Sequence, residues 1–251
     1  DFCLSRGLGD VYKRQVKESL KRMLVRKFDG ALVAGEKHRA YASSLGIPLA
    51  RSRVGFDVVD VEYFSRLSAA ARASDSDARA RHRLPRRYVL CVSRFVRRKN
   101  VDLVIKAYFR SGLHMAGTSL VLVGQGSCGP RLRRLVTKLG LNDHVEILDS
   151  VKNGEMPAVY ALAEFVVLAS DFDQWGLCIN EAFAASRPAI VTKTCGVADE
   201  LVIDGVNGFV VEPGNLEMLA DSIALLGTDL ALRERFARNA WLAARHWTPR
   251  L

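Results

Sequence analysis

The chain contains 251 residues, of which 49% are hydrophobic, and it carries a formal net charge of +10. This length allows one large or two small domains with a sizeable core. The positive charge is compatible with anionic partners such as nucleotide-sugar phosphates or acidic lipid surfaces, but the basic segments lack the interleaved aromatic residues that stack on bases, so we expect no nucleic-acid binding. The five cysteines have no metal-ligand spacing and are typical of reduced thiols, so we expect a cytoplasmic protein.

The N-terminal quarter is predicted to consist of separate short elements. Residues 1–15 show neither helical nor strand periodicity, and we interpret them as a non-native segment to be excluded from fold reasoning. Apolar and basic residues recur at helical spacing in residues 16–28, which favours a docked surface helix, with peripheral contact to an anionic inner membrane face as the alternative. A strand at Gly30–Ala34, a helix at Glu36–Leu45 and a strand at Val54–Asp60 are predicted to follow.

Residues 65–87 change in composition to Ala, Arg, Ser and Asp, with a single Pro85. This composition predicts a linker, which can be partly helical, and hence a domain boundary. Residues 16–64 would then be the remnant of a first domain, and residues 88–251 would form a second.

The second domain shows alternating strand and helix patterns. The predicted strands are Tyr88–Val92, Ser119–Val123, Val145–Leu148, Phe165–Ala169, Ala189–Thr192 and Phe209–Val211. The predicted helices are Val101–Arg110, Pro130–Leu139, Glu155–Ala163, Cys178–Ser186, a short Val197–Ile203, Leu216–Leu226 and Leu230–Arg245. This alternation predicts an α/β fold with a Rossmann-like, doubly wound parallel sheet, in which ligands bind beyond the carboxyl ends of the strands.

The loop after the fourth of these strands carries two carboxylates, Asp173 and Glu181, with Gly176 between them. A turn at Gly176 would leave the backbone N–H groups of residues 175–178 at a helix N-terminus, which favours an anion such as a diphosphate. Glu181, about one turn into the helix, could accept hydrogen bonds from vicinal hydroxyls of a ribose or hexose. Taken alone, these residues are better explained by helix capping and the helix dipole.

The loop after the first strand carries Arg94 and Lys99 and leads into a helix. Both cations could converge beyond the strand end on the anion that the Gly176 turn would face. A solvated basic loop is the alternative explanation.

A dinucleotide fingerprint occurs after the second strand, at residues 124–129, with Asp149 at 20 residues beyond Gly129. The fingerprint belongs after a first strand, however, and Pro130 follows the third glycine directly. A turn that changes the chain direction explains the same glycines. An NAD-dependent oxidoreductase is therefore an alternative that we do not favour.

The residues, taken together, resemble a known family. The shared motifs, in order and spacing, are Arg94-x(4)-Lys99, Gly124-Gln125-Gly126, Asp173-x(7)-Glu181 and Asp204-Gly205-Val206-Asn207-Gly208-Phe209. They are similar to the donor-binding half of the retaining glycosyltransferases of family 4, which have the GT-B fold of two facing Rossmann-like domains. The resemblance covers about residues 16–247, and it implies that residues 16–64 are the tail of the acceptor domain and residues 88–251 the nucleotide-sugar-binding domain.

The resemblance implies a role for each matching position. Arg94, Lys99, Asp173 and Glu181 would be the catalytic residues. Arg94 and Lys99 would contact the diphosphate, Glu181 the ribose hydroxyls and Asp173 the sugar. The remaining donor-binding positions would be Gly124, Asp149, Val151, Gln174, Trp175, Gly176 and Leu177. The family usually has Glu in place of Asp173, whose side chain reaches about 1.5 Å less far.

The expected reaction is transfer of a sugar from a nucleoside diphosphate sugar to an unidentified acceptor, without a metal or another cofactor. The leaving group would be stabilised by the two cations and the helix N-terminus. Because most of an acceptor domain is missing, we expect this chain alone to bind donor without transferring it. A non-catalytic interaction domain, which would bind no nucleotide, is a further alternative.

Overall fold

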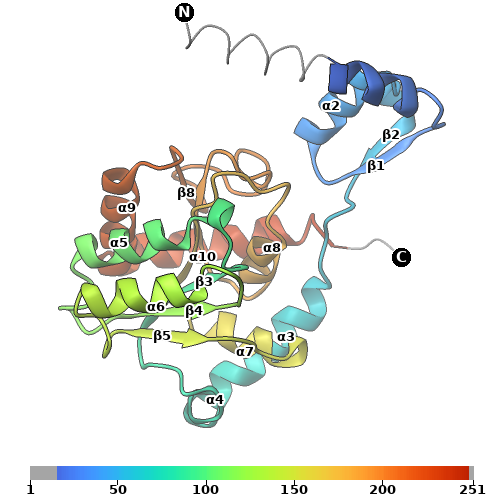
Figure 1. The fold of residues 1–251 in the computed structure, drawn as a ribbon. Helices are drawn as coiled ribbons and strands as arrows, with labels where there is room; N and C mark the ends of the chain where they lie inside the picture. The colour runs from blue at the N-terminus through green and yellow to red at the C-terminus, as the bar shows by residue number, and fades with distance from the viewer. Residues whose placement is uncertain (1–15, 249–251) are drawn as a thin grey trace, which may run out of the picture. The chain divides into compact units, whose positions relative to one another are not determined.

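The alternating pattern after residue 88 folds into a six-stranded parallel sheet, shown by a computed structural model that describes residues 16–248 (Figure 1). The strands are β3 (Tyr88–Val92), β4 (Ser119–Val123), β5 (Val145–Leu148), β6 (Phe165–Leu168), β7 (Ala189–Thr192) and β8 (Gly208–Val211). Their spatial order is β5-β4-β3-β6-β7-β8, with Val89 paired to Leu120 on one side and to Phe165 on the other. The predicted doubly wound α/β fold is confirmed.

Helices cover both faces of this sheet, which is why its central strands are continuous apolar runs. On one face, α5 (Val101–Ser111), α6 (Gly129–Lys138) and α9 (Leu216–Thr228) contribute to a single hydrophobic core with the strands. The other helices of the unit that pack together are α3 (Val61–Ala73), α7 (Met156–Ala161), α8 (Leu177–Ala184) and α10 (Leu230–Ala244). The hydroxyl of Tyr88 in β3 donates to the carbonyl of Val159 in α7 at 2.5 Å, which fixes α7 against the sheet.

The chain divides into two compact units after Asp57. The first unit has a two-stranded parallel sheet of β1 (Ala31–Val33) and β2 (Ser52–Val54), joined through α2 (Glu36–Leu45) and a 3-10 turn, η1 (Leu49–Arg51). Residues 16–25 are helical. The predicted strand at Val54–Asp60 is wrong, because only Val54 pairs and the chain after it has no partner strand among the described residues.

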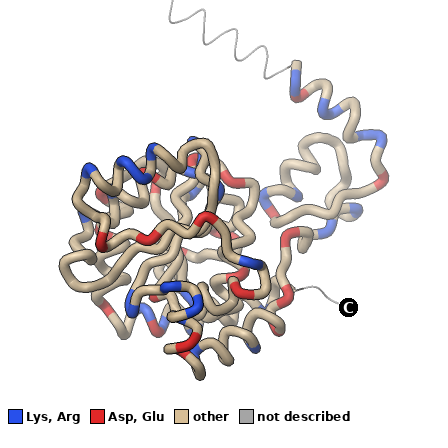
Figure 2. The backbone as a smooth tube through the Cα atoms, turned by 60° about the horizontal axis from the view of Figure 1, so that its bottom comes forward, with Lys and Arg blue, Asp and Glu red and all other residues tan. Residues whose placement is uncertain are grey.

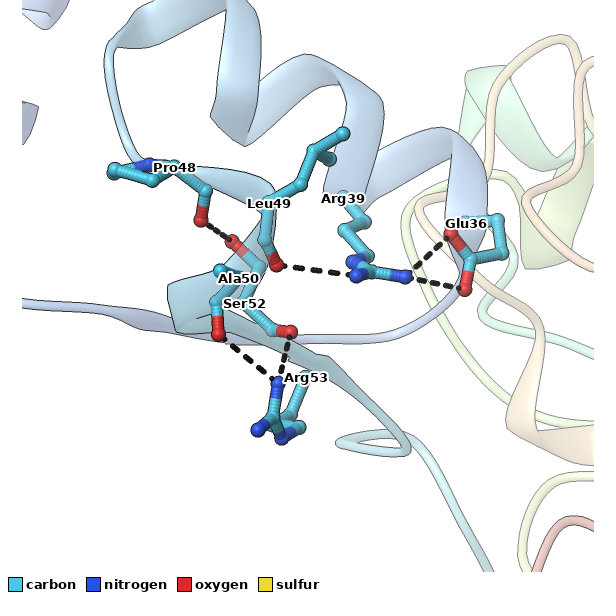
Figure 3. A network of polar contacts seen from close by, with 7 residues as sticks. All are labelled: Glu36, Arg39, Pro48, Leu49, Ala50, Ser52 and Arg53. Atoms are coloured by element: carbon cyan, nitrogen blue, oxygen red, sulfur yellow. Dashed lines mark hydrogen bonds and ion pairs between the residues drawn. The ribbon is translucent and has the colours of Figure 1, made fainter.

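Arginine side chains tie the elements of this first unit together (Figure 3). Arg39 of α2 donates to the Glu36 carboxylate at 3.2 Å and to the Leu49 carbonyl at 3.1 Å. Arg53 of β2 donates to the carbonyls of Ala50 and Ser52 at 3.1 and 3.2 Å. The connection between the two strands is thereby held by charge-assisted bonds to backbone oxygens.

The stretch predicted to be a linker, residues 65–87, is largely helical. It contains most of α3 and all of α4 (Asp75–His82). Ser65 donates to the carbonyl of Ala184 and Ser68 to that of Pro157, so α3 is docked on the sheet unit. The two compact units divide after Asp57, which is earlier in the chain than the predicted linker at residues 65–87.

Charged residues of both signs are spread along both units (Figure 2). Within residues 16–248, no helix combines the length and the apolar character needed to cross a bilayer.

Candidate functional site

The carboxyl ends of β3 and β6 form the point at which the direction of winding reverses. The chain leaves β3 toward β4 and leaves β6 toward β7, on opposite sides. The connecting loops therefore diverge, and such a switch point is where doubly wound sheets bind ligands. Both predicted clusters of functional residues lie here: Arg94 and Lys99 follow β3, and Asp173 follows β6.

The two loops are tied to each other by three contacts. The backbone N–H of Asp171 donates to the carbonyl of Arg98 at 2.9 Å, and the Asn100 side-chain amide donates to the Asp171 carboxylate at 2.9 Å. The Lys99 ammonium group forms an ion pair with Asp173. The side chains of Lys99 and Asp173 are only 11% and 15% exposed, so this pair is poorly screened by water.

The loop after β7 holds the Asp173 loop from its other side. The N–H of Gly196 donates to the carbonyl of Asp173 at 3.0 Å, and that of Val197 donates to the carbonyl of Trp175 at 3.1 Å. A Cβ atom on Gly196 would lie 2.0 Å from the carbonyl oxygen of Gln174, so only glycine permits this approach. The predicted helix at Val197–Ile203 is wrong: the segment consists of turns, and its first N–H group, that of Val197, bonds across to the Asp173 loop.

Gly176 begins helix α8 with a φ of +116°, a conformation that glycine adopts without strain. No side chain caps this helix, so the amides of its first turn have no capping acceptor. Leu177 is exposed and Gln174 is exposed beside it. The Trp175 side chain is buried: its indole donates to Asn180 at 2.9 Å, and its ring lies 4.6 Å from that of Trp247. Trp175 can therefore offer a ligand only its backbone.

Glu181 is half-buried on α8, and the Tyr160 hydroxyl of α7 donates to its Oε2 atom at 2.6 Å. Burial raises the pKa of the Glu181 carboxyl, and the bond from Tyr160 opposes that rise. Burial also raises the pKa of the Cys178 thiol, with further contributions from the charges of Glu181 and Asp173.

Arg94 is exposed and its guanidinium has no hydrogen bond or ion pair to another described residue. Its loop is instead held by backbone bonds, because the N–H of Phe95 donates to the carbonyl of Gln125 at 2.9 Å. Arg94 is therefore a cation that is positioned by its backbone and available to an anion.

The glycine turn after β4 packs against this Arg94 loop. Gly124 has a φ of +146°, and a Cβ atom there would lie 1.9 Å from the carbonyl oxygen of Ser93. A Cβ atom on Gly126 would lie 2.5 Å from the carbonyl oxygen of Phe95. These glycines are explained by the contact between two protein loops, without a dinucleotide.

Asp149 and Val151 lie apart from the other predicted site residues. They follow the edge strand β5, and exposed Asp149 pairs with Arg133 of α6 at 2.7 Å. Val151 is half-buried. Within residues 16–248, no hydrogen bond or ion pair links either residue to Lys99, Asp173 or Glu181.

Sequence reasoning missed four residues that shape the site: Tyr160, Asn100, Asp171 and Gly196. Asp171 and Asn100 flank predicted site residues, and their polar character was a usable signal. Tyr160 lies in a helix of apolar residues, and nothing near it in the sequence indicates a contact with Glu181. In the described part of the chain, no three His, Cys, Asp or Glu side chains are arranged to hold a metal ion.

Residues 74–242 match the family model described as glycosyl transferases group 1. The chain is 33% identical over 180 residues to alpha-D-kanosaminyltransferase of Streptomyces kanamyceticus, covering 68% of this chain and 46% of that protein. It is 34% identical over 196 residues to a GDP-mannose-dependent alpha-(1-6)-phosphatidylinositol monomannoside mannosyltransferase of Mycobacterium tuberculosis, covering 74% and 50%. The chain thus spans about half the length of these curated relatives.

The fold is also that of a solved structure. The crystal structure of Anabaena HepE in complex with UDP superposes with a TM-score of 0.77 at 21% identity, covering 93% of this chain and 64% of that one. This likeness confirms the Rossmann-like half of a GT-B fold. With the family match over residues 74–242, it follows that the chain belongs to the group 1 glycosyltransferases.

Proposed function

We propose that the intact protein transfers a sugar from a nucleoside diphosphate sugar to an acceptor with retention at the anomeric carbon, and that the sheet unit binds the donor. The observation that carries this proposal is the meeting of the Arg94–Lys99 loop with the Asp173–Glu181 segment at the β3/β6 switch point. Two comparisons support the donor class: HepE was crystallised with UDP, and the mycobacterial relative is named as GDP-mannose-dependent.

The proposed leaving group is a nucleoside diphosphate, whose charge needs fixed positive groups. Because Lys99 is already paired with Asp173, the pair contributes little net charge but holds the ammonium group in place. Arg94 supplies the uncompensated positive charge, and the first-turn amides of α8 add donors. Groups fixed before the reaction stabilise developing charge without reorganisation, so we propose that no metal is required.

The sugar and nucleoside would be held by the two carboxylates. Glu181 faces the ribose hydroxyls in this proposal, and the hydrogen bond from Tyr160 orients it while leaving Oε1 for a ligand. Asp173 faces the transferred sugar and uses its second oxygen to hold Lys99. Gly124, Gln174, Gly176 and Leu177 would line the donor through their backbone, and the loop at Asp149–Val151 would approach the base.

Kinetics of the intact protein with Arg94→Ala and Lys99→Ala test this assignment. Each loss of a charge donor should lower kcat by about a hundred-fold, as deletion of a single transition-state donor does elsewhere. Arg98→Ala is the matched control, because this exposed neighbour is given no role. A double variant that stays within a few-fold of wild type would refute the roles of both cations.

Ligand binding by the 251-residue chain separates the alternative functions. We expect UDP, GDP or ADP to raise its thermal stability by mass action, without sugar transfer. Stabilisation by NAD alone would favour an oxidoreductase, and stabilisation by none of the four would favour an interaction domain. Turnover of a nucleotide sugar by this chain would contradict our assignment of it as the donor-binding half.

The helical segment at residues 16–25 exposes the apolar side chains of Leu20, Met23 and Leu24 among basic residues. We propose that this surface docks on the rest of the acceptor domain, with an anionic membrane as the alternative. Flotation of the intact protein with vesicles of phosphatidylglycerol decides between them. Membrane contact predicts that the protein floats with the vesicles, and that a Leu20→Gln, Leu24→Gln variant of unchanged stability does not.

A further inference from the structure

A pocket lies at the amino end of the sheet, away from the proposed donor site at the carboxyl ends of the strands. Arg187 occupies the turn between α8 and β7, just before that strand begins. The pocket has a volume of about 530 Å³, and its walls come from this turn, α3 and α10. Its charged and large apolar lining residues are Arg72, Arg187, Glu234, Arg238, Trp241 and Leu242. The volume is within the range of small-molecule sites.

Arg187 is a largely buried cation without a counter-ion. Its Nε atom is buried and has no hydrogen-bond partner, and no described residue forms an ion pair with its guanidinium. The Glu164 carboxylate, whose charge acts on Arg187, already pairs with Arg87 at 3.3 Å and with Arg233 at 2.9 Å. Burial lowers the pKa of Arg187 to about 10, and the charge of Arg72 contributes in the same direction.

The other residues that line the pocket do not neutralise the positive charge of Arg187. Arg72 donates to the backbone carbonyl of Ala185 at 3.2 Å and thus stands beside Arg187 without an acidic partner. Glu234 is exposed, so water screens its charge. A buried cation lacking a partner is costly, and a bound anion would offset that cost.

The wall of the pocket that α10 contributes is partly apolar. Trp241 and Leu242 of α10 face it together with Ala237. Leu242 is 50% exposed, so its side chain is accessible to a ligand in the pocket. A ligand that joins an anionic group to an apolar body would contact both walls.

We propose that this pocket binds a small amphipathic anion, with its phosphate or carboxylate group on Arg187 and Arg72 and its apolar body against Trp241 and Leu242. The site is independent of the donor site, because its residues lie at the opposite ends of the strands.

Calorimetric titration of the intact protein with hexyl phosphate, in saturating UDP to occupy the donor site, tests this proposal. Arg187→Met should weaken binding by about tenfold or more, since a charge-assisted bond is lost. Arg134→Met, which removes an exposed charge from α6, should leave it unchanged. Without ligand, Arg187→Met should raise the melting temperature, because it removes an uncompensated charge.

Further variants and vesicle experiments identify the source of the anion, and they keep the proposal testable if one variant does not fold. Trp241→Ala should weaken hexyl phosphate while leaving the weaker binding of inorganic phosphate unchanged. Arg72→Met gives a second, independent loss of binding if Arg187→Met does not fold. If the protein floats with vesicles of phosphatidylcholine and phosphatidic acid, and if this flotation depends on Arg187, the anion is a lipid headgroup. If the protein binds free hexyl phosphate but does not float, the anion is a soluble ligand. Hexyl phosphate that does not bind, or that binds equally to wild type and both arginine variants, overturns the proposal.

Discussion

Lys99 and Asp173 form an ion pair across the crevice between the loops that follow β3 and β6. The two residues are 74 positions apart, and each belongs to one of the two halves into which the switch point divides the sheet. Their pairing makes the two halves of the proposed donor site one structure. It also means that Lys99 is held in place before any ligand arrives.

A double-mutant cycle on this pair should reveal a substantial coupling. Because both side chains are largely buried, we expect Lys99→Ala and Asp173→Ala to show a coupling free energy of about 1–3 kcal/mol in urea unfolding. The more exposed pair Lys106–Asp102 on α5 is the control, and its coupling should stay below about 0.5 kcal/mol. Equal coupling in the two cycles would show that the Lys99–Asp173 pair is no more than a surface contact.

Substitution of Arg94 should weaken ligand binding without lowering the stability of the fold, unlike substitution of the Lys99–Asp173 pair. Its guanidinium has no partner among the described residues, so Arg94→Ala should change the unfolding free energy by less than about 0.5 kcal/mol. Its affinity for UDP, measured by calorimetry, should nevertheless fall by about tenfold, the loss of one charge-assisted bond. A variant that unfolds more easily but binds UDP normally would indicate a structural role.

Gly124→Ala should be severely destabilising, whether or not a nucleotide is present. A methyl group there would meet the Ser93 carbonyl at 1.9 Å, and the backbone has a φ of +146°. We expect a loss of about 3 kcal/mol or more in thermal unfolding. Gly117→Ala is the control, because its φ is +72° but its surroundings are open, and it should cost only about 1 kcal/mol. Similar losses in both variants would mean that backbone conformation alone explains these glycines.

Glu181 should make the stability of the ligand-free protein depend on pH. Because burial raises its pKa above the ordinary 4.5, this carboxyl favours folding below that value, and the contribution is lost as pH rises through the raised pKa of the folded state. Glu181→Gln should therefore gain in melting temperature relative to wild type as pH rises through this window. Glu146→Gln, an exposed change on β5, should show no such trend. A difference between Glu181→Gln and wild type that is constant from about pH 4 to pH 8 would contradict the raised pKa.

Tyr160→Phe should affect the same carboxyl without touching the proposed ligand. The 2.6 Å hydrogen bond from Tyr160 opposes the rise in the pKa of Glu181 that burial causes. Without this bond the pKa should rise further, so the pH range over which Glu181 affects stability should move upward. Affinity for UDP should fall by about fivefold, because a net hydrogen bond is worth about 1 kcal/mol, while affinity for inorganic pyrophosphate should not change. Equal losses for both ligands would show that the substitution disturbs the whole site.

The sheet was predictable because burial on both faces leaves a direct mark on the sequence. Strand β7 has the predicted bounds, Ala189–Thr192, since a central parallel strand is a short apolar run between turns. Helix α3 left no comparable mark. Its apolar contacts include the buried Val61 and the half-buried Phe64, whose ring lies against that of Tyr160, and both residues precede the stretch whose composition changes. Within that stretch the bonds to the sheet unit come from Ser65 and Ser68, residues that are also common in linkers.

The site was predictable as a set of loops but not as a set of contacts. Strand order brings the ends of β3 and β6 together, so Lys99 and Asp173 were expected at one edge. Their pairing depends on side-chain directions that no local pattern records. The turns at residues 197–203 were likewise hidden, because the left-handed backbone of Asp199, at a φ of +60°, interrupts a pattern that otherwise favours a helix.

The contact between Tyr160 and Glu181 links two parts of donor recognition that the chain presents separately. The loop after β5, which we propose lies by the base, runs through η3 (Asn153–Glu155) directly into α7, and α7 carries Tyr160. A rearrangement of that loop would therefore be transmitted to the carboxylate proposed to hold the ribose. Exchange of this loop between relatives should succeed only when the whole segment from Asp149 to Tyr160 is transplanted, because the loop proposed to lie by the base and Tyr160, which orients Glu181, belong to one continuous piece of chain.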